Sequence, residues 1–164
     1  MKILAIDPGS TKSGFVVFCN TTNKIISYGK VDNCEILKMA LPDEKSGFFS
    51  QDITLIEKPD FLSYGAGDTV IEAIFWAGRF RQAFKGSITF GRNFLKKSYE
   101  VKNDAEVIKF IRINYPGIKL KADSWQAFLL IHAYETNLVS TEKRFKKKKQ
   151  KKQKVVKVVT DLFD

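Results

Sequence analysis

The sequence has few of the residues that build disulfide frameworks and zinc sites. Its 164 residues include two cysteines and a single histidine. Cys19 and Cys34 have neither metal-ligand nor redox spacing, so we expect both to be small apolar residues in a reducing compartment. No apolar run approaches the ~20 residues that span a bilayer. The apolar run at residues 1–6 meets a charge at Asp7, which makes it too short for a signal peptide. We therefore expect a cytoplasmic protein with one ordinary domain.

The positive charge of the sequence is concentrated near its C-terminal end. The net charge is +10; residues 142–157 hold ten lysines and arginines and one acid, whereas residues 1–141 carry a net charge of only +3. Such a run attracts polyanions without reading their sequence, although a solubilising tail or a targeting signal has the same composition. We predict a folded domain over residues 1–140 and a lysine-rich tail over residues 141–164. The tail is expected to contact DNA or RNA, with Lys146 and Lys147 among the contacts.

Apolar periodicity predicts an α/β domain, in which helices cover a mixed sheet. Five apolar runs are typical of strands: residues 2–6, 14–19, 24–31, 52–56 and 87–90. Short turns separate the first three, which predicts an antiparallel meander. Helices are expected at residues 35–41, at 69–84, from 103 to the turn at 115–117, and at 122–137. Two capping-box spacings, Thr69 with Glu72 and Asn103 with Glu106, predict where the second and third helices begin.

Three acids lie where a strand ends or a helix begins. Asp7 and Glu57 each follow an apolar strand directly, and Asp123 precedes the apolar stripe of the last helix. If the first and fourth strands are parallel neighbours, Asp7 and Glu57 project from one edge of the sheet, where Asp123 could join them. Carboxylates forced together repel unless a cation neutralises them, and Mg²⁺ or Mn²⁺ prefers such hard oxygen ligands. Each acid alone could be a turn residue or a helix cap, but together they predict a metal site that hydrolyses phosphodiesters.

The order of these motifs resembles that of the RuvC-like Holliday-junction resolvases. The resemblance rests on three segments, Ala5–Gly14 (AIDPGSTKSG), Leu55–Pro59 (LIEKP) and Asp123–Leu130 (DSWQAFLL). It implies a ribonuclease-H-like fold, with a mixed five-stranded sheet flanked by helices. It also implies a Mg²⁺- or Mn²⁺-dependent, structure-selective endonuclease that cuts Holliday junctions and other branched DNA as a homodimer. On this resemblance Asp7, Glu57 and Asp123 bind metal, and Gln126 joins them in the catalytic set.

Three features depart from the usual pattern of that family. Gln126 stands where the family has a second aspartate, and its carbonyl can accept a hydrogen bond or ligate weakly but carries no charge. The stretch of residues 32–51 leaves room for only a small helix, and the lysine-rich tail is not part of the usual bacterial pattern. These departures favour a phage or other viral member that works in the host cytoplasm. No motor-binding element is evident, so we expect no obligate motor partner.

The resemblance also implies aromatic contacts. Phe61 and Tyr64 follow the second acid, in a loop whose aromatic stacks on a base at the branch point in the family, although a loop aromatic is also commonly a core residue. The helix at residues 69–84 corresponds to the family's dimer interface. Its apolar side chains do not fit one buried stripe, so some could form an interface rather than core; they are Ile74, Phe75, Trp76 and Phe80.

Basic residues in the first 140 positions supply the expected phosphate contacts. They are Lys58, Arg92, Lys96, Lys97, Lys102, Lys119 and Lys121. The resemblance implies that a lysine after the fifth strand stabilises developing charge, but it does not choose among Lys96, Lys97 and Lys102. His132 lies within an apolar helix, and we expect it to be packed rather than to act as a base.

Three other functions share parts of this pattern. A branched-DNA-binding module without cleavage is favoured by Gln126, and an RNA-processing nuclease of the same fold is also compatible, because the tail does not discriminate DNA from RNA. The Asp7–Thr11 segment also resembles the first phosphate loop of sugar kinases and actin-like ATPases. Those proteins need two such domains, and 164 residues supply one.

Overall fold

The computed structural model describes residues 1–40, 51–60, 67–121 and 124–136. The chain divides into two compact units, residues 1–132 and 133–164, and the architecture below is that of the first unit. Asp123, Phe61, Tyr64, Lys146 and Lys147 lie outside the described residues. No helix in the described part is long and apolar enough to cross a membrane.

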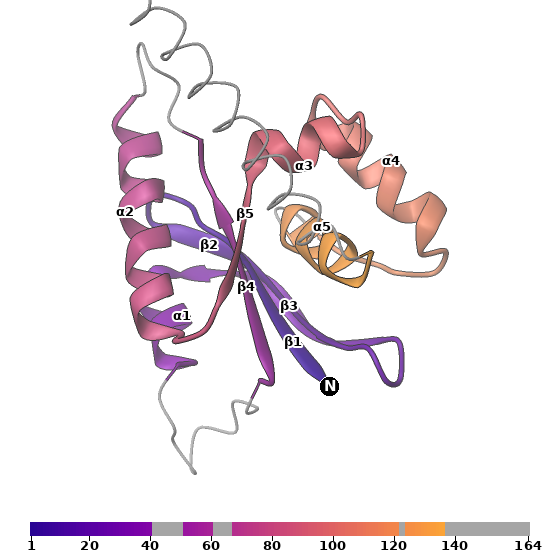
Figure 1. The fold of residues 1–164 in the computed structure, drawn as a ribbon, viewed down its shortest axis with the longest axis horizontal. Helices are drawn as coiled ribbons and strands as arrows, with labels where there is room; N and C mark the ends of the chain where they lie inside the picture. The colour runs from indigo at the N-terminus through magenta and orange to yellow at the C-terminus, as the bar shows by residue number, and fades with distance from the viewer. Residues whose placement is uncertain (41–50, 61–66, 122–123, 137–164) are drawn as a thin grey trace, which may run out of the picture. The chain divides into compact units, whose positions relative to one another are not determined.

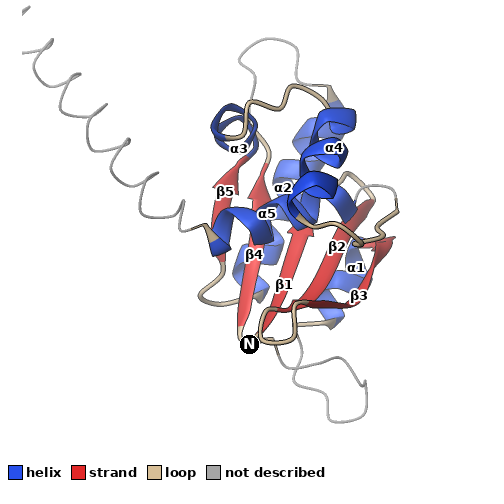
Figure 2. Cartoon of the chain, turned by 90° about the vertical axis from the view of Figure 1, so that its right-hand side faces the viewer, coloured by secondary structure: helices blue, strands red, loops and turns tan. Residues whose placement is uncertain are grey.

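A five-stranded mixed sheet forms the centre of the first unit, as the sequence predicted (Figures 1 and 2). The strands are β1 (Lys2–Asp7), β2 (Lys12–Cys19), β3 (Lys24–Asp32), β4 (Ile53–Lys58) and β5 (Ile88–Gly91), in the order β3-β2-β1-β4-β5. The first three form the predicted antiparallel meander. β4 runs parallel to β1 on its other side, and β5 runs parallel to β4. The central β1 is almost wholly apolar because both of its faces are covered.

Helices cover the two faces of the sheet (Figure 1). α1 (Asn33–Lys38) and α2 (Asp68–Ala83) lie on one face. α3 (Arg92–Ser98), α4 (Asp104–Asn114) and α5 (Ser124–Glu135) lie on the other side. Side chains alternate between the faces of each strand. Leu4 and Ile6 therefore pack in one cluster with Phe80 of α2, whereas Phe18 of β2 contacts Phe128 of α5 edge to face.

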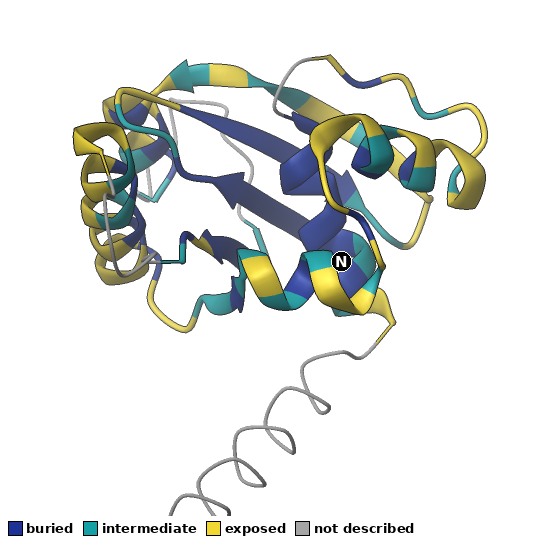
Figure 3. Cartoon of the chain, turned by 90° about the horizontal axis from the view of Figure 1, so that it is seen from above, coloured by how far each residue is buried: buried dark blue, intermediate teal, exposed yellow. Residues whose placement is uncertain are grey.

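The two outer layers differ in how deeply they are buried. Every residue of α5 from Ser124 to Ile131 is buried, which fits a helix that is apolar around its whole circumference. On α2, Phe80 is fully buried while Phe75 is 55% exposed. In Figure 3 the strands in the middle of the sheet are dark blue, and α2, at the left edge, is largely yellow.

Two predicted helix starts have different outcomes. The Asn103 side chain caps α4 by accepting a hydrogen bond from the Glu106 backbone N–H at 3.0 Å, so this prediction is confirmed. The Thr69 prediction is wrong, because α2 begins at Asp68 and its N-cap is Gly67, which has no side chain to accept a bond. α3 was not predicted, so the described order contains one helix more than expected.

Candidate active site at the ends of β1, β4 and β5

A tight turn follows β1 and requires glycine. A Cβ atom on Gly9 would lie 2.2 Å from the backbone oxygen of Lys12, which no side chain could tolerate. The turn is held by two buried polar side chains. Ser13 donates to Asn33 Oδ1 at 2.6 Å, and Asn33 Nδ2 donates to the Gly9 carbonyl at 3.1 Å. Both side chains are almost fully buried, so this network fixes the backbone directly after Asp7.

Asp7 and Glu57 lie on neighbouring parallel strands. Ile6 of β1 pairs with Ile56 of β4, so the residues that follow, Asp7 and Glu57, come to the same edge of the sheet. The two strands are parallel neighbours, which is the arrangement that the predicted pairing of these acids required. Asp7 is 8% exposed and Glu57 is 1% exposed. Two buried carboxylates at one edge require compensating positive charge.

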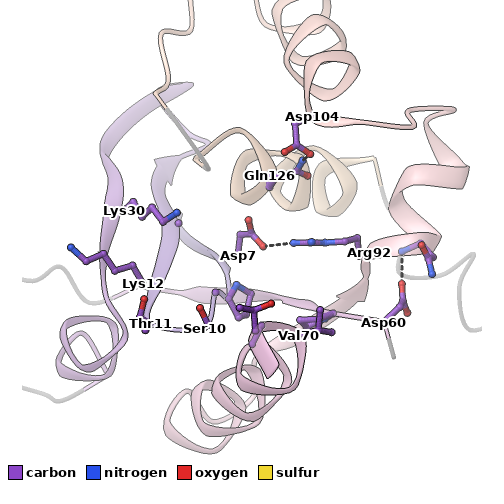
Figure 4. Close-up of a pocket in the computed structure, with 17 residues that line it drawn as sticks. Asp7, Ser10, Thr11, Lys12, Lys30, Asp60, Val70, Arg92, Asp104 and Gln126 are labelled. Atoms are coloured by element: carbon purple, nitrogen blue, oxygen red, sulfur yellow. Dashed lines mark hydrogen bonds and ion pairs between the residues drawn. The ribbon is translucent and has the colours of Figure 1, made fainter. Parts of the chain in front are cut away.

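Arg92 supplies positive charge to both carboxylates. It is the first residue of α3, directly after β5, and its guanidinium bridges the two acids. Nη2 donates to Asp7 Oδ1 at 2.9 Å (Figure 4), and Nε donates to Glu57 Oε1. Burial raises the pKa of Glu57, although the charge of Arg92 opposes this rise. Burial disfavours the charge of Arg92, but Glu57 and Asp7 outweigh it and hold its pKa above the ordinary value.

Gln126 faces a second acid from above Asp7 (Figure 4). Its Nε2 donates to Asp104 Oδ1 at 2.6 Å. Because an ionised carboxylate only accepts hydrogen bonds, this contact fixes the amide with its nitrogen toward Asp104. The amide oxygen is then the end of Gln126 that remains for a ligand. Asp104 is the first residue of α4, directly after the Asn103 cap.

These side chains surround one cavity of about 710 Å³. Asp7, Arg92, Asp104 and Gln126 all line it, together with the turn after β1. Lys12 and Lys30 line it as well, and Figure 4 shows them on the opposite side from Arg92. The cavity lining therefore combines acidic and cationic side chains, and of its acids Asp7 is buried.

The predicted lysines occupy different positions around this site. Lys58, at the end of β4, is exposed, as are Lys97, Lys102, Lys119 and Lys121. Lys96 is half-buried, and its charge contributes to lowering the pKa of Glu57, against the larger effect of burial. Among the three lysines that the resemblance left open, Lys96 is the one with this electrostatic link to a carboxylate of the site.

Two residues of the site have roles that the sequence analysis missed. Arg92 was expected to contact phosphate and not to bridge Asp7 and Glu57, and Asp104 was not singled out. A signal for Arg92 was present, since it directly follows Gly91, which ends β5 beside Lys58, the last residue of the parallel strand β4. The only sequence feature of Asp104 is its place directly after the helix N-cap, where acidic residues are common.

The donor set fits a hard divalent cation. The Asp7 and Glu57 oxygens converge on one guanidinium, and Mg²⁺ is commonly held through one or two carboxylates with water completing its shell. Within the described ranges no three histidine, cysteine or acidic side chains are grouped closely enough to hold a metal ion. The third predicted ligand, Asp123, lies outside those ranges.

Comparisons with known proteins identify the fold. No family model matches the sequence, and no curated protein matches it. Two solved structures of the RuvC protein of Thermus thermophilus are similar to the chain. RuvC in complex with a Holliday junction substrate superimposes with a TM-score of 0.54 and 14% sequence identity, over 79% of this chain and 90% of that one. The RuvC structure described without a substrate gives 0.53 and 15%, with the same coverage. The α/β fold of the chain is thus that of the ribonuclease-H-like RuvC proteins.

Proposed function

We propose that the chain is a metal-dependent nuclease that hydrolyses phosphodiesters in Holliday junctions and other branched DNA. The observation that carries this proposal is the placement of Asp7 and Glu57. Two buried carboxylates lie at the ends of adjacent parallel strands, beside a glycine turn, and Asp7 lines a cavity that Lys12, Lys30 and Arg92 also line. Buried acids at such an edge do little for stability, but they suit a site that recruits a cation and a phosphate.

Asp7 and Glu57 would hold Mg²⁺ or Mn²⁺, and Asp123 is proposed as a third ligand. When bound, such an ion polarises the phosphate and activates water. The residues of the chain then bind and orient the substrate. Arg92 and Lys96 place positive charge beside the carboxylates, where the negative phosphate must enter. The Gln126 amide oxygen, fixed by Asp104, can accept a hydrogen bond from an attacking water.

Two findings support branched DNA as the proposed substrate: the similarity to RuvC structures and the positive charge of the chain. One similar structure is described as RuvC in complex with a Holliday junction substrate. In this chain Lys12 and Lys30 line the cavity, and the lysine-rich tail adds further charge. Stacking of Phe61 or Tyr64 on a base at the branch point, and phosphate contacts from Lys58, Lys97, Lys102 and Lys121, complete the proposed DNA interface.

A homodimer is part of this proposal, because two symmetric cuts require two sites. α2 exposes apolar side chains at Ile71 and Phe75, which are 50% and 55% exposed. Exposed apolar residues grouped on one helix often form a contact between chains. A phage or viral source, a host-cytoplasmic location and action without a motor partner also remain proposals.

Binding of branched DNA without cleavage is the second candidate. Arg92 already neutralises part of the charge of Asp7 and Glu57, and Gln126 adds no charge. A site balanced in this way could hold a phosphate through Arg92 without recruiting a cation.

A cleavage assay separates the two candidates. Purified protein is incubated with an end-labelled four-way junction, or with a linear duplex carrying the same arm sequence, in Mg²⁺ or in EDTA. The nuclease proposal predicts paired cuts near the branch point, in Mg²⁺ alone and on the junction far more than on the duplex. Tight junction binding with no cleavage in Mg²⁺ or Mn²⁺ would establish the binding module instead.

A further inference from the structure

Arg92 occupies the position between Asp7 and Glu57 that a cation shared by the two carboxylates would take. Its Nη2 and Nε atoms are two donors of one planar guanidinium, and each binds a carboxylate oxygen of a different strand. The oxygens therefore converge on a centre that already carries one positive charge. The Arg92 side chain is 40% exposed, whereas the Asp7 and Glu57 side chains, counted without their backbone, are 10% and 1% exposed.

The charge of Arg92 offsets part of the charge of the carboxylates at this centre. Among the described acids, its guanidinium contacts Asp7 and Glu57, and its single positive charge neutralises half of theirs. Gln126 is uncharged, and its nitrogen is bound to Asp104. Two ions close together need several carboxylates, because each ion would otherwise repel the other and the guanidinium.

Arg92 is also held in place by the elements around it. It begins α3 directly after β5, and the next residue, Asn93, donates its backbone N–H to Asp60 Oδ2 at 2.5 Å. Leu95, one turn along, is 1% exposed and anchors the helix. Without the guanidinium, the buried Glu57 carboxylate would lose its ion-pair partner, which is costly.

From these contacts we propose that Arg92 takes the place of a second divalent cation, so that the site binds one divalent ion per chain and keeps the guanidinium as its second positive centre. The inference rests on the proposed function, because it concerns the same site. Arg92 is then a positioning residue, which holds Asp7 and Glu57 together and determines how many ions they bind.

Titration of the full chain with Mn²⁺ tests this proposal, with binding followed by calorimetry and by electron paramagnetic resonance. The wild type should bind one Mn²⁺ per chain. Arg92→Met removes the charge but keeps an apolar stem, and it should bind two Mn²⁺ or bind the first at least about ten-fold more tightly, as expected when a like charge is removed nearby. Lys109→Met, at an exposed position of α4 and with the same change in charge, should match the wild type.

Arg92→Lys provides a second variant if Arg92→Met does not fold. An ammonium keeps the charge but cannot present two donors in a fixed fork, so its Mn²⁺ affinity should lie between those of the wild type and Arg92→Met. Two ions in the wild type, or no change in stoichiometry and affinity in either Arg92 variant, would overturn the proposal. A wild type that takes up no Mn²⁺ while Arg92→Met does would also overturn it. One Mn²⁺ bound without junction cleavage would refute the proposed nuclease and leave this inference standing.

Discussion

Gln126 is uncharged, and its amide is hydrogen-bonded to the carboxylate of Asp104, which carries negative charge beside it. The amide nitrogen of Gln126 lies 2.6 Å from Asp104 Oδ1. A carboxylate that hydrogen-bonds a ligating side chain fixes its orientation and strengthens it as a donor. Asp104 is therefore a positioning residue for the Gln126 oxygen.

Replacing Asp104 tests this relation. Asp104→Asn removes the charge while an amide oxygen can still accept from Gln126, so Mn²⁺ affinity should fall by about 10-fold, the lower end of the range for outer-shell partners. Asp68→Asn, at the exposed start of α2, is the matched control and should bind Mn²⁺ as the wild type does. Equal affinities in Asp104→Asn and the wild type would show that Asp104 does not act on the site.

His132 has a structural role of the kind that the sequence analysis expected. Its Nδ1 lies 3.1 Å from the Tyr115 hydroxyl, and the rings of Tyr99 and Phe110 surround it. Burial lowers the pKa of His132 below its ordinary value of 6.5. The unfolded chain therefore takes up the proton first as pH falls, and the folded state loses stability between pH 6.5 and the lower pKa of the folded state.

A phenylalanine at this position should remove that acid sensitivity. Urea unfolding at about pH 7.5 and about pH 5.5, which bracket the histidine pKa, should show a larger loss of unfolding free energy in the wild type than in His132→Phe. An identical loss in both proteins would mean that His132 does not titrate differently on folding.

At the scale of elements, the strands were predictable and α3 was not. The five strands are apolar runs bounded by turns, so each one is evident from local sequence. α3 has seven residues, begins after Gly91 without a side-chain cap, and buries only Leu95. A helix of this length shows no clear period, and contacts with the rest of the fold stabilise it instead. The sequence places Arg92 directly after β5, but its contacts with both Asp7 and Glu57 follow from how α3 packs.

α2 has apolar side chains in the core and others at the surface, so substitutions in the two groups should affect stability and assembly separately. Phe80 is fully buried against β1 and β4, and Phe75 is 55% exposed. Phe80→Ala should lower the free energy of unfolding by about 3–5 kcal/mol. Phe75→Ala should change it by less than about 0.5 kcal/mol in dilute protein, but should weaken the proposed dimer in analytical ultracentrifugation. A dimer unaffected by Phe75→Ala would contradict the proposed interface.

At the scale of the whole molecule, Asp7 and Glu57 were predictable as neighbours because each is fixed by its own strand. The parallel pairing of β1 with β4 brings the two strand ends together. Arg92 and Asp104 come from helices whose packing is determined by long-range contacts, so sequence spacing alone does not place them. The boundary at residue 140 and the metal role of Asp123 stay predictions.

The charge distribution of the chain predicts how the tail acts. Residues 142–157 carry most of the net charge of +10. Truncation after Ser140 should lower junction affinity and weaken the dependence of that affinity on salt. The slope of log affinity against log salt concentration should become shallower by about 0.9 for each phosphate that the tail no longer neutralises. Fluorescence anisotropy at several salt concentrations measures both quantities. An unchanged affinity and slope would mean that the tail does not bind DNA.

The most direct test of the central claim, that Asp7 anchors a metal-dependent nuclease site, is the single-turnover rate of four-way-junction cleavage in Mg²⁺. Asp7→Asn keeps the shape of the side chain and removes its charge. Its rate should fall by more than the roughly 10–100-fold expected when only an outer-shell partner of a metal is removed. Asp32→Asn, an exposed acid whose side chain makes no capping hydrogen bond to α1, should cleave at the wild-type rate. Cleavage by Asp7→Asn at the wild-type rate would contradict the assignment of the site.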